Sequence, residues 1–359
     1  VVIDDDSVGA QLEQTNSKVG GLAKGIGGAF AGIATAVGGA AVAIGGASLK
    51  VGMDFEKSMS QVAATAGWTT EELNTVGSEA QISFARLEEA ARKAGRATKF
   101  TASESAEALN YMALAGWDVE QQIAGLPVIL DLAAAGNMDL AYASDLVTDS
   151  MSVLGLEVED LGGFTDQLTR ISQRSNTSIA QLGEAILVAG GQAKIAGLSV
   201  EDTNVALGLL ANYGLKGAEG GTALRNALKN MYTPTSDAAK ALKELGVATS
   251  DSDGNLRDFQ DVLKDLDSSL GSMNEADLLK SMDRIFDTRT IAGANALIEQ
   301  NGAAWDKLSE ALYDADGNFV ALGATSDAAA TQLDNFAGDI TKLQAQLAEM
   351  GLEIYKSMP

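Results

Sequence analysis

Apolar side chains recur in alternating steps of three and four residues at both ends of the chain. One series runs from Leu12 to Val51 and the other begins at Leu333. Such steps place one apolar seam along a helix, and a seam sustained over several heptads is typical of a coiled coil. The predicted seam positions are Ile26, Phe30, Ile33, Val37 and Ile44 in the first series, and Leu333, Phe336, Ile340, Leu343, Leu347, Met350 and Ile354 in the second.

A coiled-coil seam is stable only against another helix, so both series predict an oligomerisation surface. The polar residue Asn16 interrupts the first seam, at a position where a buried polar side chain fixes the register of paired helices. We therefore expect this chain to form a small homo-oligomer in which the seams pack together.

The stretch from Gly25 to Leu49 carries no charge and is bounded by Lys24 and Lys50. Its length suffices for a helix to span a bilayer. Glycines repeat every seven residues here and just beyond, and on a helix they form a bare face beside the seam. The repeat comprises Gly25, Gly32, Gly39 and Gly46 in one register and Gly38, Gly45 and Gly52 in another. Gly28 and Gly32 have the spacing of close helix contacts in lipid. Two interpretations stay open: a helix buried in its own assembly, which we favour, and a membrane span.

Between residues 54 and 330 the apolar pattern divides into many short helices with explicit ends. The same junction occurs at Gly67-Trp68-Thr69, Gly116-Trp117-Asp118 and Gly197-Leu198-Ser199. Glycine ends a helix in the left-handed conformation, the apolar residue packs into the core, and Thr, Asp or Ser caps the next helix. Thr101 and Glu104 have the spacing of a capping box. We expect the core residues to include Trp68, Trp117 and Trp305.

Two nearly identical sequences interrupt the helices, Asp251-Ser252-Asp253-Gly254-Asn255 and Asp314-Ala315-Asp316-Gly317-Asn318. Neither fits a calcium loop, because the glycine is fourth instead of sixth and the twelfth residue is not Glu. We interpret both as turns between very short strands. The expected fold is therefore all-α, with a compact multi-helix core over 54–330, long coiled-coil-like helices over 1–53 and 331–359, and at most a minor β-hairpin.

The chain contains no cysteine and no histidine. This excludes disulfides, Cys/His zinc sites and both Ser-His-Asp and Cys-His catalysis within the chain. The glycines at 25–27 fail as a dinucleotide loop because Phe30 stands in place of the third glycine, and those at 217–221 lack the lysine of a nucleotide-binding loop. Tight helix packing explains these glycines better. We predict no catalytic residue, no metal site and no cofactor.

The formal net charge is −24, from 25 Lys and Arg residues against 49 Asp and Glu residues. Nucleic-acid binding depends on Lys and Arg contacts to phosphates, so this balance argues against a DNA- or RNA-binding protein. The compact basic cluster comprises Arg92, Lys93, Arg96 and Lys99. It lies at the end of a predicted helix, where cations complement the helix dipole, and we prefer this interpretation to an anion site.

Eight short segments, taken in order, resemble the core region of phage tail tape measure proteins. They are residues 55–59, 97–104, 126–135, 177–182, 207–214, 221–228, 285–289 and 293–298. The resemblance is strongest from Leu207 to Gly214 and from Gly221 to Leu228, and it covers about Asp54 to Leu312. One departure is Asp287, where the family pattern favours glycine or another small residue.

The resemblance implies a non-enzymatic structural protein that sets tail length while tube subunits polymerise around it. Its implied partners are further copies of itself and the tail tube, tail tip or baseplate proteins. Its implied location is the lumen of the virion tail after assembly in the bacterial cytoplasm, followed by expulsion during genome ejection and contact with the host membrane. Because the chain begins at Val1 and not at Met, we expect it to be part of a longer parent.

Two other classes of function stay open. The uncharged residues 25–49 also fit the alternative of a membrane-inserting pore or toxin-like helical protein, which liposome leakage by a peptide of residues 1–60 would support. A lone glutamate is compatible with a cell-wall hydrolase, which an absence of muramidase activity in the purified chain would exclude.

Overall fold

The computed structural model describes residues 40–287 and 290–357. In this part of the chain there are seventeen α-helices and one short 3-10 helix, and no strand. The predicted all-α fold is therefore confirmed. By their internal contacts the described residues divide into two units, one of residues 40–54 with 350–357 and one of residues 55–349. The division into segments 1–53, 54–330 and 331–359 stays a prediction.

The helices have the following bounds. Those of the first half are α2 (Ala40–Thr65), α3 (Thr70–Asn74), α4 (Glu79–Ala97), α5 (Ala102–Leu114), α6 (Val119–Ala135), α7 (Leu140–Leu154), η1 (Val158–Asp160) and α8 (Leu161–Arg174). Those of the second half are α9 (Ile179–Ile195), α10 (Val200–Asn212), α11 (Gly217–Tyr232), α12 (Ser236–Glu244), α13 (Phe259–Gly271), α14 (Glu275–Ile285), α15 (Ile291–Gln300), α16 (Ala303–Ser309), α17 (Ala324–Leu333) and α18 (Phe336–Ser357).

The repeated junctions form as the sequence predicts. Gly67, Gly116 and Gly197 have φ angles of +75°, +84° and +78°, in the left-handed region that glycine adopts without strain. The apolar residue after each glycine donates its backbone N–H to the carbonyl five residues earlier, at 3.0 Å in all three cases. This is the Schellman hydrogen bond, and it turns the chain directly into the next helix.

The predicted caps are also present. The side chains of Thr69, Asp118 and Ser199 each accept the backbone N–H of the residue three positions later. Thr101 and Glu104 form a complete capping box, in which the Glu104 carboxylate accepts the N–H of Thr101 at 2.7 Å. Each satisfied N–H stabilises a helix start by about 1 kcal/mol, so these sequences fix where the helices begin.

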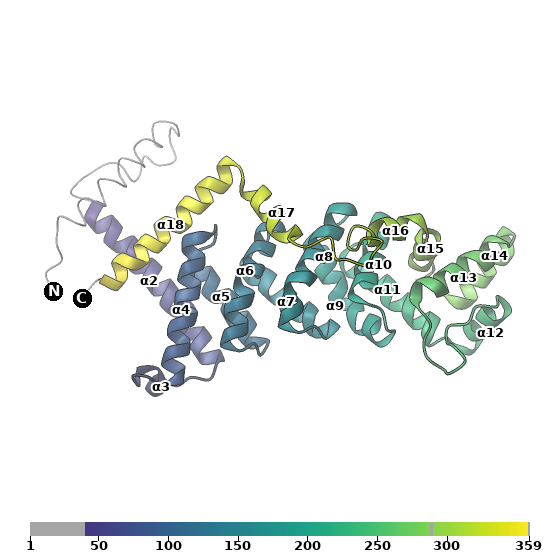
Figure 1. Cartoon of the computed structure of the whole chain (residues 1–359), viewed down its shortest axis with the longest axis horizontal. Helices are drawn as coiled ribbons and strands as arrows, with labels where there is room; N and C mark the ends of the chain where they lie inside the picture. Colours follow the sequence, from purple (N-terminus) through teal and green to yellow (C-terminus); the bar gives the residue numbers. More distant parts are fainter. Residues whose placement is uncertain (1–39, 288–289, 358–359) are drawn as a thin grey trace. The chain divides into compact units, whose positions relative to one another are not determined.

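Helices of the unit at residues 55–349 pack mainly on helices one or two places away along the chain. In one series α4, α5, α7, α9 and α11 each pack against the next, and in a second series α6, α8 and α10 do the same. The second series continues from α10 to α15 and α16. Figure 1 shows α17 lying back along the second series, where it packs against α6 and α8 although Thr325 of α17 follows Asp166 of α8 by 159 residues.

Small residues allow these helices to approach closely. A Cβ atom on Gly221 of α11 would lie only 2.4 Å from the carbonyl oxygen of Ala185 on α9, and one on Gly183 would lie 2.6 Å from the Leu146 side chain on α7. The interpretation of the glycines at 217–221 as packing residues is therefore confirmed at Gly221.

One prediction about the core is wrong. Trp305 is buried, with its ring centroid 6.2 Å from that of Phe259, but Trp68 and Trp117 are only half-buried. Trp117 lies across Gly125 of α6, where a Cβ atom would come within 2.5 Å of the indole ring. Both tryptophans line a shallow cleft beside the helix junctions, because the junctions turn at the surface and not within the core.

The two acidic sequences are turns, as predicted. In each, one antiparallel bridge pairs the residues that flank the turn, Ser250 with Leu256 and Tyr313 with Phe319. The Asp251 carboxylate accepts the backbone N–H groups of Asp253 and Asn255, both at 2.9 Å. Asp314 makes the equivalent bonds in the second turn. These carboxylates thus stabilise the turns, and no group of acids in the described residues is arranged to hold a metal ion.

Candidate functional site

Two neighbouring helices, α4 and α6, enclose a groove on the surface of the unit at residues 55–349. Ser78 caps α4 by accepting the N–H of Gln81 at 3.1 Å. Asp118 caps α6 through a capping box with Gln121. Because both starts are fixed, the registers of the two helices are fixed, and so are the side chains that they present to each other.

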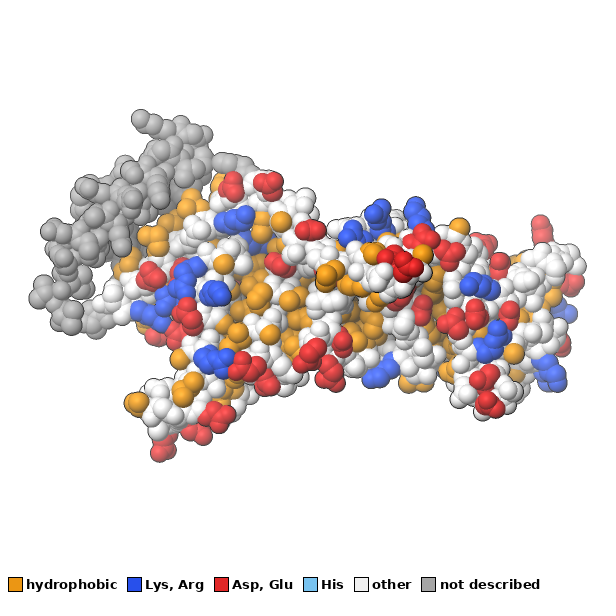
Figure 2. Space-filling model, in the orientation of Figure 1, with side chains coloured by type: hydrophobic (Ala, Val, Ile, Leu, Met, Phe, Trp, Pro, Cys, Tyr) orange, Lys and Arg blue, Asp and Glu red, His pale blue; other side chains and the backbone are white. Residues whose placement is uncertain are grey.

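The groove has a volume of about 870 Å³ and a mainly apolar lining. Leu126 and Leu130 of α6 form its buried base, whereas Ile82 of α4 is 52% exposed at its side. Pro127 also lines it, and since proline has no N–H it cannot bond the carbonyl of Ile123 one turn earlier. Figure 2 shows hydrophobic side chains gathered on this face, with charged side chains around them. The groove is thus a mainly apolar concavity with charged side chains at its border.

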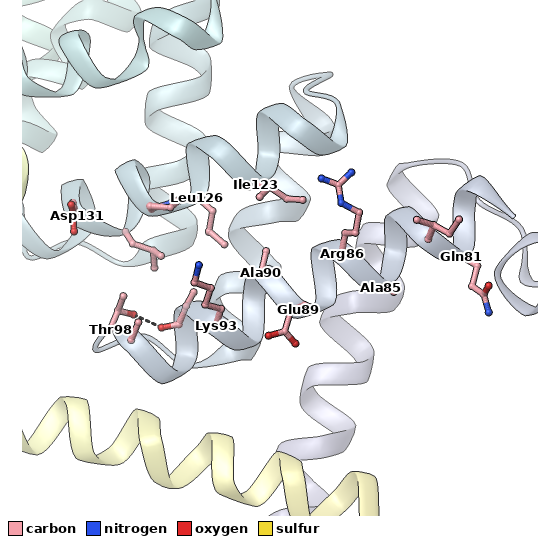
Figure 3. Close-up of a pocket in the computed structure, with 15 residues that line it drawn as sticks. Gln81, Ala85, Arg86, Glu89, Ala90, Lys93, Thr98, Ile123, Leu126 and Asp131 are labelled. Carbon is pink, nitrogen blue, oxygen red and sulfur yellow. Dashed lines mark hydrogen bonds between the residues drawn. The ribbon is translucent and has the colours of Figure 1, made fainter. Parts of the chain in front are cut away.

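Charged residues mark the ends and the middle of the groove (Figure 3). At one end Arg86 forms a two-point ion pair with Glu120, with 2.8 Å between Nη2 and Oε2, and the guanidinium lowers the pKa of the Glu120 carboxyl. At the other end lies Asp131, whose pKa is raised by burial and then by the carboxylate of Asp166. Lys93 lies between them and makes no ion pair within the described residues.

The adjacent face of α4 binds a carboxylate of α18. Glu349 is 4% exposed, and its Oε1 atom lies 2.7 Å from Nη2 of Arg92 and 3.1 Å from Nη1 of Arg96. The basic cluster lies in the last turns of α4 and just beyond, as predicted, where cations complement the helix dipole. The helix dipole accounts for only part of the role of this cluster, because Arg92 and Arg96 also bind the anionic side chain of Glu349.

The second predicted seam does not coincide with the buried face of α18. The buried positions are Gly338, Ala345, Glu349 and Leu352. Of the seam positions, Leu333, Ile340, Leu343, Leu347 and Ile354 are half-buried and Met350 is 37% exposed. In heptad terms the seam occupies a and d while the buried residues occupy c and f, on the opposite side of the helix. Oligomerisation through the seam stays a prediction.

The remaining predicted seam residues cannot be compared with a buried face in the same way. Ile26, Phe30, Ile33 and Val37 lie outside the described residues. Ile44 lies on α2 and Phe336 at the start of α18, and the structure describes the backbone of both but not their side chains.

Within the smaller unit, α2 and α18 pass each other closely. A Cβ atom on Gly52 of α2 would lie 2.1 Å from the ring of Tyr355 on α18, and one on Gly351 of α18 would lie 3.6 Å from the Cα atom of Ser48. Gly52 belongs to the seven-residue glycine repeat that predicted a bare helical face. At this position the bare face accommodates an aromatic ring of another helix.

Sequence reasoning missed the residue that holds α17 in place. The buried carboxylate of Asp166 on α8 accepts the backbone N–H groups of Gly323, at 2.7 Å, and Thr325, at 2.9 Å. It serves as an N-cap for α17 from outside the helix. Its only signal in the sequence is an acidic residue inside an otherwise amphipathic helix, and 49 acids in the chain make such positions common.

The unexpected Asp287 also acts as a cap. Its Oδ1 atom accepts the backbone N–H of Thr290 at 3.0 Å and the hydroxyl of Thr290 at 2.9 Å, directly before α15. A small residue would leave these groups without this acceptor, so the departure from the family pattern has a local structural reason.

No single helix among the described residues has the length and apolar composition of a membrane span, and only the bent pair α6 and α7 passes that test together. Both helices carry a large share of the buried core. The stretch at 25–49 lies mostly outside the described residues.

Comparison with known proteins gives a consistent result. The family model of phage-related minor tail proteins matches residues 88–287. The chain is 30% identical over 293 residues to the tape measure protein of Pneumococcus phage Dp-1, which covers 82% of this chain and 24% of that protein. It is 28% identical over 309 residues to the probable tape measure protein of Escherichia phage P2, covering 85% of this chain and 36% of that protein.

The chain thus spans about a quarter to a third of the length of these two relatives. The resemblance to tape measure proteins that the ordered segments indicated is confirmed. No solved structure matches the chain.

Proposed function

The chain belongs to the phage-related minor tail proteins, and from this membership we propose that it is the helical core region of a tail tape measure protein. The observation that carries the proposal is the similarity to two tape measure proteins along more than four fifths of the chain. Long helical parts of the parent outside this region would supply the ruler, because a helix has a fixed rise of about 1.5 Å per residue and so relates chain length to distance.

In this role a few copies of the parent lie along the lumen of the growing tail. Tube subunits polymerise around them until the end of the parent is reached, and the parent is expelled when the genome leaves. The chemistry of this region suits a protein that acts through contacts and not through catalysis, because it lacks histidine and cysteine. Its net charge of −24 repels DNA, which must later pass through the same lumen.

The proposed copies associate through the seam of α18. Glu349 and the other buried residues of α18 use one side of the helix, which leaves Leu343, Leu347 and Met350 on the other side for a second copy. The Leu and Ile side chains of a coiled-coil seam gain stability only when a partner helix removes them from water. The tail tube and the tail tip or baseplate proteins are the remaining proposed partners.

Mass spectrometry of purified tails tests the proposal. Peptides from residues 100–230 are quantified against those of the tube subunit, with a capsid protein as the control for contamination. A few copies per tail support the tape measure role. Absence from assembled tails, with recovery of the protein from cell membranes, contradicts it and favours the pore alternative.

A second experiment tests the length-setting step. An in-frame duplication of residues in a long helical part of the parent, outside residues 54–330, is expected to lengthen the tails measured by electron microscopy. The increase should be proportional to the number of residues added, at about 1.5 Å for each helical residue. Tails of unchanged length would show that the parent is a tail component that does not set length.

The membrane alternative concerns residues 25–49 and has its own test. Ile33→Asp and Val37→Asp place charges in the middle of the uncharged stretch, where charged side chains oppose insertion into a bilayer. Normal tails that fail to deliver DNA would assign this stretch a membrane step after assembly. Failure to assemble would assign it to packing within the tail.

A further inference from the structure

The groove between α4 and α6 leaves apolar side chains in contact with water. Ile82 is half-exposed, and Ala85, Ala90, Ile123 and Pro127 continue the apolar lining (Figure 3). A contiguous apolar concavity bordered by charged residues is typical of a binding surface, whereas isolated exposed apolar side chains are ordinary. In the described residues no helix of this chain covers it.

The dimensions of the groove fit a helix. Its lining extends along α4 from Gln81 to Thr98, which at a rise of about 1.5 Å per residue is roughly 25 Å. The base is made by two packed helices, whose side chains form ridges separated by a furrow. An amphipathic helix of about four turns fills such a groove with side chains spaced three and four residues apart.

The charges of the lining orient the occupant. Arg86 is neutralised by Glu120, and Glu89 by Arg96, so these four residues leave no net charge at the groove. Lys93 remains in the middle without an ion-pair partner among the described residues, and Asp131 remains at one end. A carboxylate on the occupant is therefore favoured next to Lys93, and a hydrogen-bond donor is favoured next to Asp131.

The neighbouring face of α4 shows that this helix binds carboxylates of other helices. Glu349 of α18 is held there between Arg92 and Arg96. Lys93 follows Arg92 directly, so its side chain points about 100° further round the helix, towards α6. The two faces of α4 thus each present a positive charge, one to Glu349 of α18 and the other to an occupant of the groove.

We propose that the α4/α6 groove binds an amphipathic helix of a second tail protein, with its apolar side against Ile82, Ile123 and Leu126 and with a carboxylate against Lys93. This inference rests on the proposed location of the chain in a tail. A different protein is assigned to the groove because the proposed contact between copies already uses the seam of α18, on another helix, and leaves this groove for a separate partner.

Site-specific photo-crosslinking in assembled tails tests this proposal. The parent carries p-benzoylphenylalanine in place of Ile82, in the groove, or in place of Leu279, which is 62% exposed on α14 and serves as the matched control. The cross-linked peptides are then identified by mass spectrometry. The expected result is a cross-link from position 82 to a helical segment of another tail protein, with apolar residues spaced by three and four and with an acidic residue beside them.

Charge reversal in the groove adds a second measurement. Lys93→Glu is expected to reduce the yield of the position-82 cross-link by roughly fivefold or more, whereas Lys93→Arg retains it. Lys240→Glu on α12, an exposed lysine outside the groove, makes the same change in net charge and should have no effect.

Three outcomes would overturn the proposal. A yield at position 82 no higher than that at position 279 would show that the groove is vacant in tails. A cross-link to another copy of the same parent would make the groove a self-contact. A yield with Lys93→Glu equal to that with Lys93 would show that no acidic side chain of the occupant binds at Lys93. Absence of the parent from tails is a separate result, which the quantification of residues 100–230 detects and which contradicts the proposed function itself.

Discussion

The carboxylate of Asp166 on α8 accepts the backbone N–H of Thr325 at 2.9 Å, across 159 residues of sequence. The same carboxylate accepts the N–H of Gly323, and the hydroxyls of Thr169 and Thr325 lie 3.0 Å apart beside it. These bonds attach the start of α17 to the second series of helices. They place a negative charge at the positive end of the α17 helix dipole, in a position from which water is excluded.

Asp166→Asn is therefore expected to weaken the attachment of α17. The amide keeps one oxygen acceptor but directs an N–H₂ group at a backbone N–H, so one hydrogen bond is lost together with the favourable charge. We expect a loss of about 1–2 kcal/mol in the free energy of unfolding. Urea denaturation measures it, and hydrogen exchange at 323–333 should accelerate. Asp267→Asn, at an exposed position of α13, is the control. Unchanged exchange at 323–333 would contradict the capping role.

Glu349→Gln is expected to release α18 locally. The substitution removes the negative charge between Arg92 and Arg96 and leaves the guanidinium of Arg92, which is mostly buried, without it. We expect a cost of roughly 2–3 kcal/mol, below the full value for a buried pair because Arg96 is partly exposed. The measurement is hydrogen exchange along 336–357, because a helix that loses a buried ion pair opens locally without unfolding the whole unit.

A double variant separates the charge from the packing. If Glu349 acts mainly by neutralising the arginines, combining Arg92→Met with Glu349→Leu should recover most of the protection of α18, because the uncompensated buried charge is gone. Glu310→Gln, exposed at the end of α16, controls for the change in net charge. Protection of α18 that is equal in wild type and Glu349→Gln would show that other contacts hold the helix.

Gly221→Ala and Gly191→Ala are expected to have opposite effects. On α11 a Cβ atom at Gly221 would lie 2.4 Å from a backbone oxygen of α9, so the two helices must move apart, at a cost of about 1–3 kcal/mol. On α9 a Cβ atom at Gly191 would meet nothing within 4 Å, so alanine only improves helix propensity, by up to about 1 kcal/mol. Thermal denaturation of both variants tests this. Stabilisation by Gly221→Ala would disprove the close contact.

The pH dependence of stability should carry a contribution from Asp131. Burial and the Asp166 carboxylate raise the pKa of the Asp131 carboxyl. The folded protein then binds this proton more tightly than the unfolded chain does, so the group destabilises the fold as pH rises from about 4 through the raised pKa. Asp131→Asn is therefore expected to be more stable than wild type at pH 7, and the difference should vanish near the unfolded pKa of about 4.

Chemical denaturation at several pH values measures this effect. Asp306→Asn, at an exposed position of α16, makes the same change in net charge and controls for the general repulsion within an acidic chain. A variant that is less stable than wild type at pH 7 would show that a partner stabilises the charged form of Asp131.

The features that the sequence predicted correctly are local ones. Gly116, Trp117 and Asp118 end one helix and start the next through hydrogen bonds to residues at most five positions away. The acidic turn at Asp251 is equally self-contained. Such patterns can be read from sequence because all the interacting groups lie within one short segment.

The features that it did not predict depend on partners far away in sequence. Nothing next to Asp166 indicates that it caps α17, and nothing next to Arg92 indicates that its anion is Glu349. The half-buried state of Trp117 depends on how closely α6 passes at Gly125. The α4/α6 groove was missed for the same reason, since its lining combines a half-exposed face of α4 with a half-exposed face of α6. Only the packing of the two helices makes them one surface.

The attachment of α17 to α8 also determines how the unit responds to tension. The helices of each series are held mainly by helices one or two places away along the chain, so the contacts broken when the chain is pulled are close together in sequence. The Asp166–Thr325 bond instead closes a loop of 159 residues. A force applied from the α18 side therefore reaches α18 and then α17 before it reaches α8 to α16, and from that side the bonds of Asp166 must break before α8 to α16 can unravel.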